Sequence, residues 1–210
     1  YMDGNRLYFL IGDVSGKGVP ASLFMAITRS LFRTLSQQVL SPAKIVTDMN
    51  NSISDNNESN MFVTLIVGIL DLETGKLKLC NAGHNPPILI RPDGQVSFLE
   101  FKTQIFVGVI EEFAYTEDET TLEKGSKLFL YTDGVTEAEN TEKELYGDEK
   151  LLKTLSDNNT SDVRTTVNGI EDSVADHVKE AEASDDLTIL LIQYEPGQQT
   201  IKHISLWKEK

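Results

Sequence analysis

Residues 7–18 read LYFLIGDVSGKG, an apolar run that ends in an aspartate and passes into a glycine-rich turn. The short apolar run predicts a β-strand over residues 7–13. Beyond Pro20 the apolar residues recur at helical spacing, which predicts a helix that lasts to about residue 39. The positions expected to face the core from this helix are Phe24, Ile27, Leu31 and Leu35.

This strand, turn and helix are close to a phosphate-binding P-loop, which requires the pattern G-x-x-x-x-G-K-[ST]. Only three residues separate Gly12 from Gly16, and Gly18 stands where the motif needs a hydroxyl group. The spacing therefore disfavours nucleotide binding and directs attention to Asp13. A carboxylate at the end of a strand can bind Mg²⁺ or Mn²⁺, hard cations that prefer oxygen ligands. An aspartate at this place can equally serve only to cap the turn.

The rest of the chain predicts an α+β fold, because antiparallel hairpins dominate and the helices come in clusters. A second helix is expected from Pro42, with Ser41 as its cap and with Ile45, Met49 and Ile53 along one side. Further strands are expected at residues 61–71, 76–81, 113–122, 126–132 and 187–194, with a hairpin over 86–100 and a helical stretch clearest over 163–178.

Two more strand ends carry acidic residues. Asp133 follows the apolar run KLFLYT, and the pair Asp185 and Asp186 directly precedes the last strand. Carboxylates that converge raise one another's pKa unless cations lie between them. Each match alone is weak, since an aspartate before a glycine also occurs in ordinary turns, as at Asp93. Together with the aspartate of the opening stretch, the set predicts a divalent-metal site.

Composition excludes several other classes of protein. The net charge of −14, from 19 basic and 33 acidic residues in a chain of 210, argues against binding to nucleic acid or to anionic lipid. The single cysteine, Cys80, allows no intrachain disulfide and favours a reducing compartment. The longest apolar run, residues 61–70, is too short to span a bilayer, and no signal peptide is visible.

Four stretches, FLIGDVSGKGVPASLFMA, VTLIVGILDLETGKLKLCNAGHNPPILI, LFLYTDGVTEA and SDDLTILLI, resemble the PPM metal-dependent protein phosphatases. The resemblance covers about residues 7–193 and is closest to the bacterial SpoIIE-like branch, with its RsbU-type regulators. It implies a four-layer α-β-β-α sandwich of two antiparallel sheets flanked by helices. It also implies one phosphatase domain over residues 1–195, followed by a tail, 196–210, that forms an edge strand or leads to a further module.

The same resemblance implies the site and its chemistry. Two Mn²⁺ or Mg²⁺ ions are expected, with Asp13 as the bridging carboxylate and Val14 lending its backbone carbonyl. Asp133 and Asp185 would serve the second ion, with Asp186 as the alternative to Asp185. Phosphoserine or phosphothreonine would be hydrolysed by a water held between the ions. The stretch NAGHNPP, directly after the cysteine, holds no arginine that could bind a phosphate, so Cys80 is expected to be a core residue rather than a nucleophile.

The family also has an earlier acidic strand, of the form G-G-D-x-x-D, that these 210 residues do not match. The N-terminal strand is therefore expected to be missing and the first metal position to be incomplete, which keeps open a pseudophosphatase that binds a phosphoprotein without turnover. His84 is expected to tie a turn together rather than to bind metal, and Lys17 either attracts phosphate or is a solvated charge.

The resemblance finally implies partners. The expected substrate is a phosphorylated STAS-type anti-sigma-factor antagonist, and an upstream sensor domain is expected to regulate the domain, with the helices over residues 19–56 as a switch. A homodimer is compatible with the family. The expected location is the cytoplasm, where the domain is free or belongs to a membrane-tethered protein, without membrane contact or nucleic acid of its own.

Overall fold

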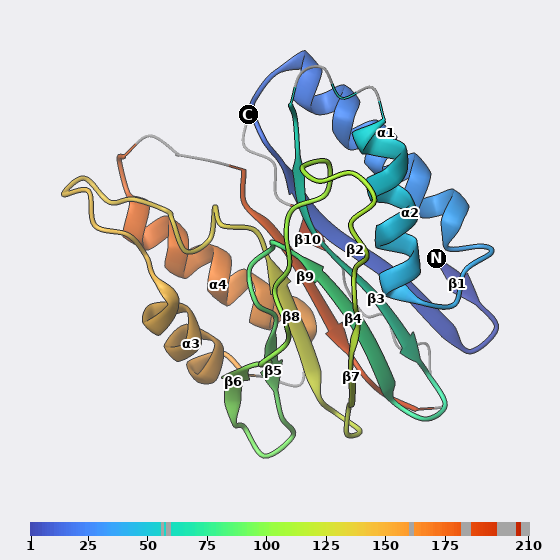
Figure 1. The fold of residues 1–210 in the computed structure, drawn as a ribbon. Helices are drawn as coiled ribbons and strands as arrows, with labels where there is room; N and C mark the ends of the chain where they lie inside the picture. The colour runs from blue at the N-terminus through green and yellow to red at the C-terminus, as the bar shows by residue number, and fades with distance from the viewer. Residues whose placement is uncertain (56, 58–59, 160–161, 182–185, 197–204, 207–210) are drawn as a thin grey trace. The chain divides into compact units, whose positions relative to one another are not determined.

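The computed structural model describes residues 1–55, 57, 60–159, 162–181, 186–196 and 205–206, the last two by their backbone alone. The chain forms two compact units, each with a sheet of its own (Figure 1). The first unit comprises residues 1–84 and 100–122, and the second comprises 85–99 and 123–210.

The first unit is built on a five-stranded antiparallel sheet in the order β1-β2-β3-β4-β7. The strands are Met2–Asp3 (β1), Arg6–Val14 (β2), Val63–Asp71 (β3), Lys76–Ala82 (β4) and Asp118–Thr121 (β7). β2 and β3 pair along their full length, with Asp13 opposite Thr64. This long ladder holds the end of β2, where the predicted bridging aspartate lies.

Helices α1 (Val19–Leu35) and α2 (Pro42–Ser54) lie next to each other against this sheet (Figure 1). α2 begins as the sequence predicts, because Pro42 occupies its first turn and Ser41 Oγ accepts a hydrogen bond of 3.2 Å from Lys44 N. Ile45 and Met49 of α2 are fully buried together with Leu65 and Val67 of β3. Each such side chain contributes about 1.5–3 kcal/mol through burial.

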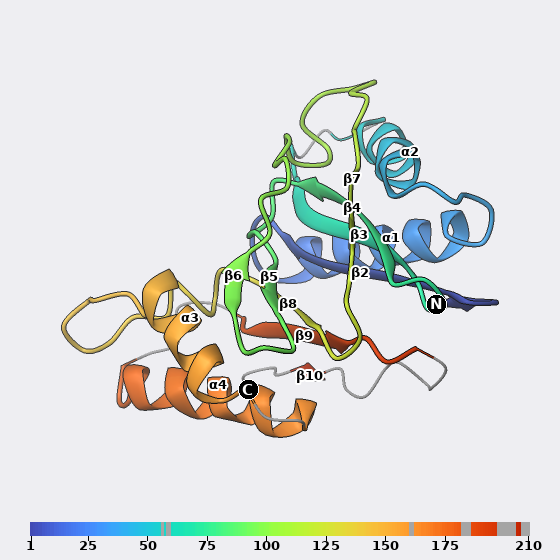
Figure 2. The same ribbon diagram turned by 90° about the horizontal axis from the view of Figure 1, so that it is seen from below.

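The second unit has its own five-stranded antiparallel sheet, in the order β10-β9-β8-β5-β6. Its strands are Ile88–Ile90 (β5), Val96–Phe98 (β6), Lys127–Tyr131 (β8), Thr188–Gln193 (β9) and Ser205–Leu206 (β10). Figure 2 shows α3 (Asp148–Asp157) and α4 (Val163–Val178) beside this sheet. Phe129 of β8, Leu151 of α3 and Ile170 of α4 are fully buried in one core.

The α+β class with two antiparallel sheets and clustered helices is confirmed, while several details differ from the expectation. Ile27 is 54% exposed, so its assignment to the core face of α1 was wrong. The strand expected over residues 113–122 is limited to β7. The residues before β7 form a loop instead, in which Tyr115 is buried with its ring packed on Phe113. β7 and β8 flank the turn at residues 124–125 but pair in different sheets.

The long helical stretch of the second half is divided between α3 and α4, and the pattern clearest over residues 163–178 corresponds to α4 alone. In the tail, β10 pairs with β9 at the edge of the sheet, as one of the two expectations for that segment proposed. Within the described residues, no helix combines the length and the apolar character that crossing a membrane requires.

Candidate active site

Asp13 lies at the carboxyl end of β2, where hydrogen bonds to the chain that enters β3 hold the backbone in place. Beyond the last pair of the ladder, Ser15 N donates to Phe62 O at 2.9 Å, and Ser15 Oγ accepts from Phe62 N at 2.9 Å. A Cβ on Gly12 would lie 2.7 Å from Thr64 O, so only glycine allows β3 to approach this closely. Asp13 is half-buried and therefore sits on a rigid element at the edge of solvent.

The glycines after Asp13 serve the turn into α1. Gly16 and Gly18 have φ angles of 87° and 79°, values that side-chain-bearing residues rarely adopt. Gly18 precedes the first residue of α1, and its carbonyl accepts from Ser22 N at 3.0 Å. Lys17 between them is exposed. The glycines are thus accounted for by backbone conformation, in agreement with the rejection of a P-loop.

His84 is buried and connects the turn after β4 to the strand beside Asp13. Its backbone N donates to Asn81 Oδ1 at 2.8 Å, and Asn81 Nδ2 donates to His84 O at 3.0 Å. The ring Nδ1 lies 2.9 Å from Thr64 Oγ1, which in turn lies 3.4 Å from Asp13 O. The expectation that His84 ties a turn together is confirmed, and the contact with Thr64 adds a connection that the sequence did not indicate.

Asp133 follows β8 and begins a tight turn in the second unit. Its backbone carbonyl accepts from Glu137 N at 2.7 Å, and Val135 N donates to Thr132 O at 3.1 Å. Oδ1 of Asp133 is buried from solvent. A buried carboxylate oxygen costs free energy unless a cation or hydrogen-bond donors compensate its negative charge. This oxygen is therefore expected either to bind a metal ion or to accept hydrogen bonds within the protein.

The structure brings the Asp133 turn together with the start of β9. A Cβ on Gly134 would lie only 2.4 Å from Asp186 O, so the two segments touch through backbone atoms. Asp186 itself is exposed, and Asp185 lies outside the described residues. Two of the three acidic strand ends are therefore neighbours within one unit. The third, at Asp13, belongs to the other unit, and the convergence of all three stays a prediction.

The donor chemistry of the predicted site fits a hard divalent cation, since it consists of carboxylates and the backbone carbonyl of Val14. Among the residues that the structure describes, which omit Asp185, no group of three or more His, Cys, Asp or Glu side chains is arranged to hold a metal ion. The fit thus rests on the kind of donors and on the buried oxygen of Asp133.

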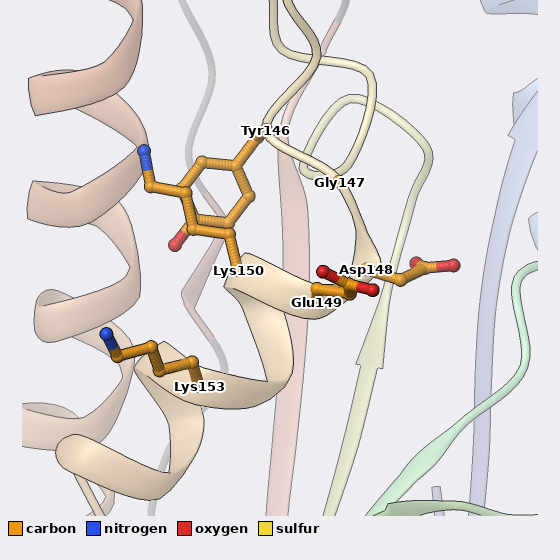
Figure 3. A pocket seen from close by; sticks show the side chains of 6 residues that line it. All are labelled: Tyr146, Gly147, Asp148, Glu149, Lys150 and Lys153. Carbon is orange, nitrogen blue, oxygen red and sulfur yellow. The ribbon is translucent and has the colours of Figure 1, made fainter.

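A separate hollow in the second unit, at the start of α3, contains none of the predicted site residues. Figure 3 shows the side chains that line it, namely those of Tyr146, Asp148, Glu149, Lys150 and Lys153, beside the backbone of Gly147. Lys150 lies over the Tyr146 ring, 4.8 Å from its centroid, and its Nζ donates to His177 Nδ1 at 3.0 Å. Two carboxylates and two lysines line the hollow, and the Lys150 contacts join α3 to α4.

Sequence reasoning missed two hydroxyl residues beside the acidic strand ends, Thr64 and Thr132. Thr132 could have been suspected, because a hydroxyl directly before a strand-end aspartate often bonds to nearby backbone. Thr64 left no comparable signal, since only the register of β2 on β3 places it opposite Asp13.

Comparison with solved structures shows the fold, and the family model shows the family. The fold is that of the PP2C phosphatase domain of SpoIIE from Bacillus subtilis, with a TM-score of 0.75 at 18% identity, over 94% of this chain and 61% of that one. The family model for stage II sporulation protein E (SpoIIE) matches residues 3–195. The chain therefore belongs to the SpoIIE family of PPM-type phosphatases, as its motifs predicted.

Two curated relatives extend this result. Phosphoserine phosphatase RsbU of Bacillus subtilis is 26% identical over 192 residues, which is 91% of this chain and 56% of RsbU. Protein IcfG of Synechocystis is 29% identical over 213 residues, which is 89% of this chain and 33% of IcfG. The chain thus spans between a third and somewhat more than half of the length of these relatives.

Proposed function

We propose that this chain is a metal-dependent protein serine/threonine phosphatase domain that removes phosphate from phosphoserine or phosphothreonine on a partner protein. The observation that carries the proposal is the contact between the Asp133 turn and the chain at Asp186, which brings two acidic strand ends of the family motifs together. Membership in the SpoIIE family and the phosphoserine phosphatase activity in the name of RsbU support the same reaction.

In this proposal the first unit would supply Asp13 and the carbonyl of Val14 as metal ligands, and the second unit would supply Asp133 and Asp185. Bound Mn²⁺ or Mg²⁺ would supply an activated water and neutralise charge on the phosphoryl oxygens. Two proteins of the same fold were solved with such ions, RsbX with magnesium and the phosphatase PstP with two manganese ions.

The ladder between β2 and β3 would keep the Asp13 carboxylate in place during the reaction, and the closed turn would do the same for Asp133. Fixed groups of this kind lower the barrier because they need not reorganise as charge develops. Cys80 would take no part, since it is buried and burial raises the pKa of its thiol to about 12. The chain thus contributes ligands and orientation, and no covalent nucleophile.

We further propose that the substrate is a phosphorylated STAS-type anti-sigma-factor antagonist and that an upstream sensor domain regulates its hydrolysis in the cytoplasm. Support comes from the likeness to RsbU. The acidic net charge of −14 fits a protein partner better than a nucleic acid. The alternative is a pseudophosphatase that binds the same phosphoprotein without turnover.

The test measures phosphate release from a phosphoserine-bearing STAS protein with Mn²⁺. We expect Asp13→Asn and Asp133→Asn each to lower the rate by at least about 100-fold, because each removes a charged metal ligand. Asp93→Asn is the matched control. Asp93 also precedes a glycine in a turn, but its Oδ1 only accepts from Gln95 N at 3.0 Å on the surface.

Equal rates for Asp133→Asn and Asp93→Asn would contradict the assignment of the site. No release by the wild-type protein, together with retained binding of the phosphorylated partner, would favour the pseudophosphatase. Binding of ATP without release of phosphate from the protein substrate would instead revive the nucleotide-binding interpretation of residues 12–18.

A further inference from the structure

We propose that Thr132 is a positioning residue, whose hydroxyl sets the spacing between Asp133 and the chain at Asp186 and thereby the affinity for divalent metal. This inference rests on the proposed function, because it assigns a metal to the site of which Asp133 is part. Thr132 itself is not a ligand in this proposal and acts through its neighbours.

The hydroxyl of Thr132 makes two hydrogen bonds to the segment that enters β9. Oγ1 donates to Asp186 O at 3.1 Å and accepts from Thr188 N at 3.0 Å. The backbone N of Thr132 also donates to Thr188 O at 3.1 Å. One residue therefore contacts the opposite segment through three hydrogen bonds.

These bonds lie where the regular strand pairing stops. The last paired residues of β8 and β9 are Tyr131 and Ile189, so Thr132 is the first residue beyond the ladder. The backbone bond from Thr132 N to Thr188 O continues the pairing, and the side-chain hydroxyl accepts from Thr188 N, so that this N–H stays satisfied where the chain turns away at Asp133. Thr132 is only 2% exposed, so water does not compete for these bonds.

The close approach of Gly134 to Asp186 O lies at the same point. The Asp133 turn is therefore fixed on the start of β9 both by the hydrogen bonds of Thr132 and by the backbone contact of Gly134. Metal ligands must be held to within about 0.5 Å of the productive geometry, and groups that orient ligands typically change metal affinity about 10- to 100-fold when they are removed. Thr132 occupies that role for the second unit.

The experiment measures Mn²⁺ binding by calorimetry and urea unfolding of the metal-free protein for four forms of the chain. Thr132→Val keeps the shape of the side chain and removes the hydroxyl, whereas Thr132→Ser keeps the hydroxyl. Thr166→Val is the matched control. Thr166 is also fully buried in the same unit, and its Oγ1 donates to Asn158 O at 3.1 Å, with Asp162 O at 3.3 Å.

We expect Thr132→Val to weaken Mn²⁺ binding about 10-fold or more, Thr132→Ser to bind within about three-fold of wild type, and Thr166→Val to bind as wild type does. Both valine variants should lose stability to a similar extent, since each removes a buried hydroxyl that is hydrogen-bonded. This pattern would separate a positioning role from a merely structural one.

Wild-type affinity in Thr132→Val would overturn the inference while leaving the proposed function intact. So would an equal loss of affinity in Thr166→Val, or a failure of Thr132→Ser to restore binding, because the effect would then not belong to the hydroxyl at this position. Absence of Mn²⁺ binding by the wild-type protein would refute the proposed function, and this inference with it.

Discussion

At the scale of single residues, the aspartates Asp13 and Asp133 share one arrangement. Asp13 lies at the end of β2 and Asp133 follows β8, and each has a threonine hydroxyl nearby. Thr64 Oγ1 donates to the backbone of Asp13, and Thr132 Oγ1 donates to Asp186 O on the neighbouring segment. A β-branched hydroxyl residue packs well in or next to a strand and can also satisfy a backbone group where the ladder ends. Both sites thus gain rigidity from neighbours that carry no charge.

Cys80 provides a prediction at this scale. Burial in β4 raises the pKa of its thiol to about 12, and Gln104 Nε2 lies 3.9 Å from its Sγ. Only the thiolate reacts, so the native protein should react with a thiol reagent at pH 8 more than about 100-fold more slowly than the urea-unfolded chain. Absorbance measures the two reaction rates, and equal rates in the folded and the unfolded state would show that Cys80 is accessible.

At the scale of elements, the start of α2 shows how a helix is fixed from outside itself. Ser41 caps the helix, and Glu117 in turn accepts from Ser41 Oγ at 2.6 Å and from Ala43 N at 3.2 Å. The other carboxylate oxygen of Glu117 accepts from Lys78 Nζ of β4 at 2.8 Å. A negative charge at a helix N-terminus is favourable, so Glu117 joins α2 to the sheet.

The pH dependence of stability follows from this contact. Burial alone would raise the pKa of Glu117, but the hydrogen bonds from Lys78, Ser41 and Ala43 outweigh it and lower the pKa below 4.5. Because the folded-state pKa is depressed, the stabilisation is fully present above about pH 4.5 and is lost as the pH falls through the folded-state pKa.

We therefore expect Glu117→Gln to lower the free energy of unfolding by about 1 kcal/mol at pH 7, with a smaller difference from wild type below pH 4. Urea unfolding at several pH values measures this. Glu119→Gln is the control, since its pair with Lys76 is exposed on both sides and should contribute little. A loss for Glu117→Gln that does not change with pH would contradict the electrostatic explanation.

α1 shows the limit of periodicity as a guide to packing. Its apolar residues surround much of the helix, so the sequence pattern alone does not define a single buried face. Phe24 and Leu31 pack on the core of the first unit, whereas Val19, Leu23 and Ile27 are exposed. Which of these faces is buried depends on the sheet against which the helix packs.

At the scale of the whole molecule, each unit has its own sheet, its own helix pair and its own buried core. The proposed metal ligands are divided between the units, with Asp13 in one and Asp133 in the other. A ligand that binds the folded protein and not the unfolded chain raises stability in proportion to the logarithm of its concentration. Bound metal should therefore stabilise the folded protein against unfolding.

We expect Mn²⁺ at about 100 times its dissociation constant to stabilise the protein by about 2.7 kcal/mol. For a chain of this size, that corresponds to a rise in Tm of roughly 5–10 °C. Differential scanning calorimetry with added Mn²⁺, reversed by EDTA, measures this. The rise should vanish in Asp13→Asn and persist in Asp93→Asn, and a rise of the same size in both variants would place the metal elsewhere.

The sequence was a good guide to features that depend on nearby residues. The strand before Asp13, the start of α2 at Ser41 and the antiparallel pairs were all predictable, because strand pattern, capping and turn chemistry act over a few positions. The family was also recognisable, since its motifs are continuous stretches. The division into α3 and α4 was not predicted. Nor was the short extent of β7, because a buried apolar residue in a loop, such as Tyr115, looks in the sequence like a buried residue of a strand.

By itself, then, the sequence determined the α+β class, the family and the acidic strand ends at Asp13 and Asp133, because each of these depends on residues that are contiguous in the chain. Only the tertiary structure decided which residues support them. Thr132 meets Asp186 across 54 positions and Glu117 meets Ser41 across 76, contacts that exist only after distant strands and helices have packed. Such contacts depend on register and on approach in space, which no local pattern encodes.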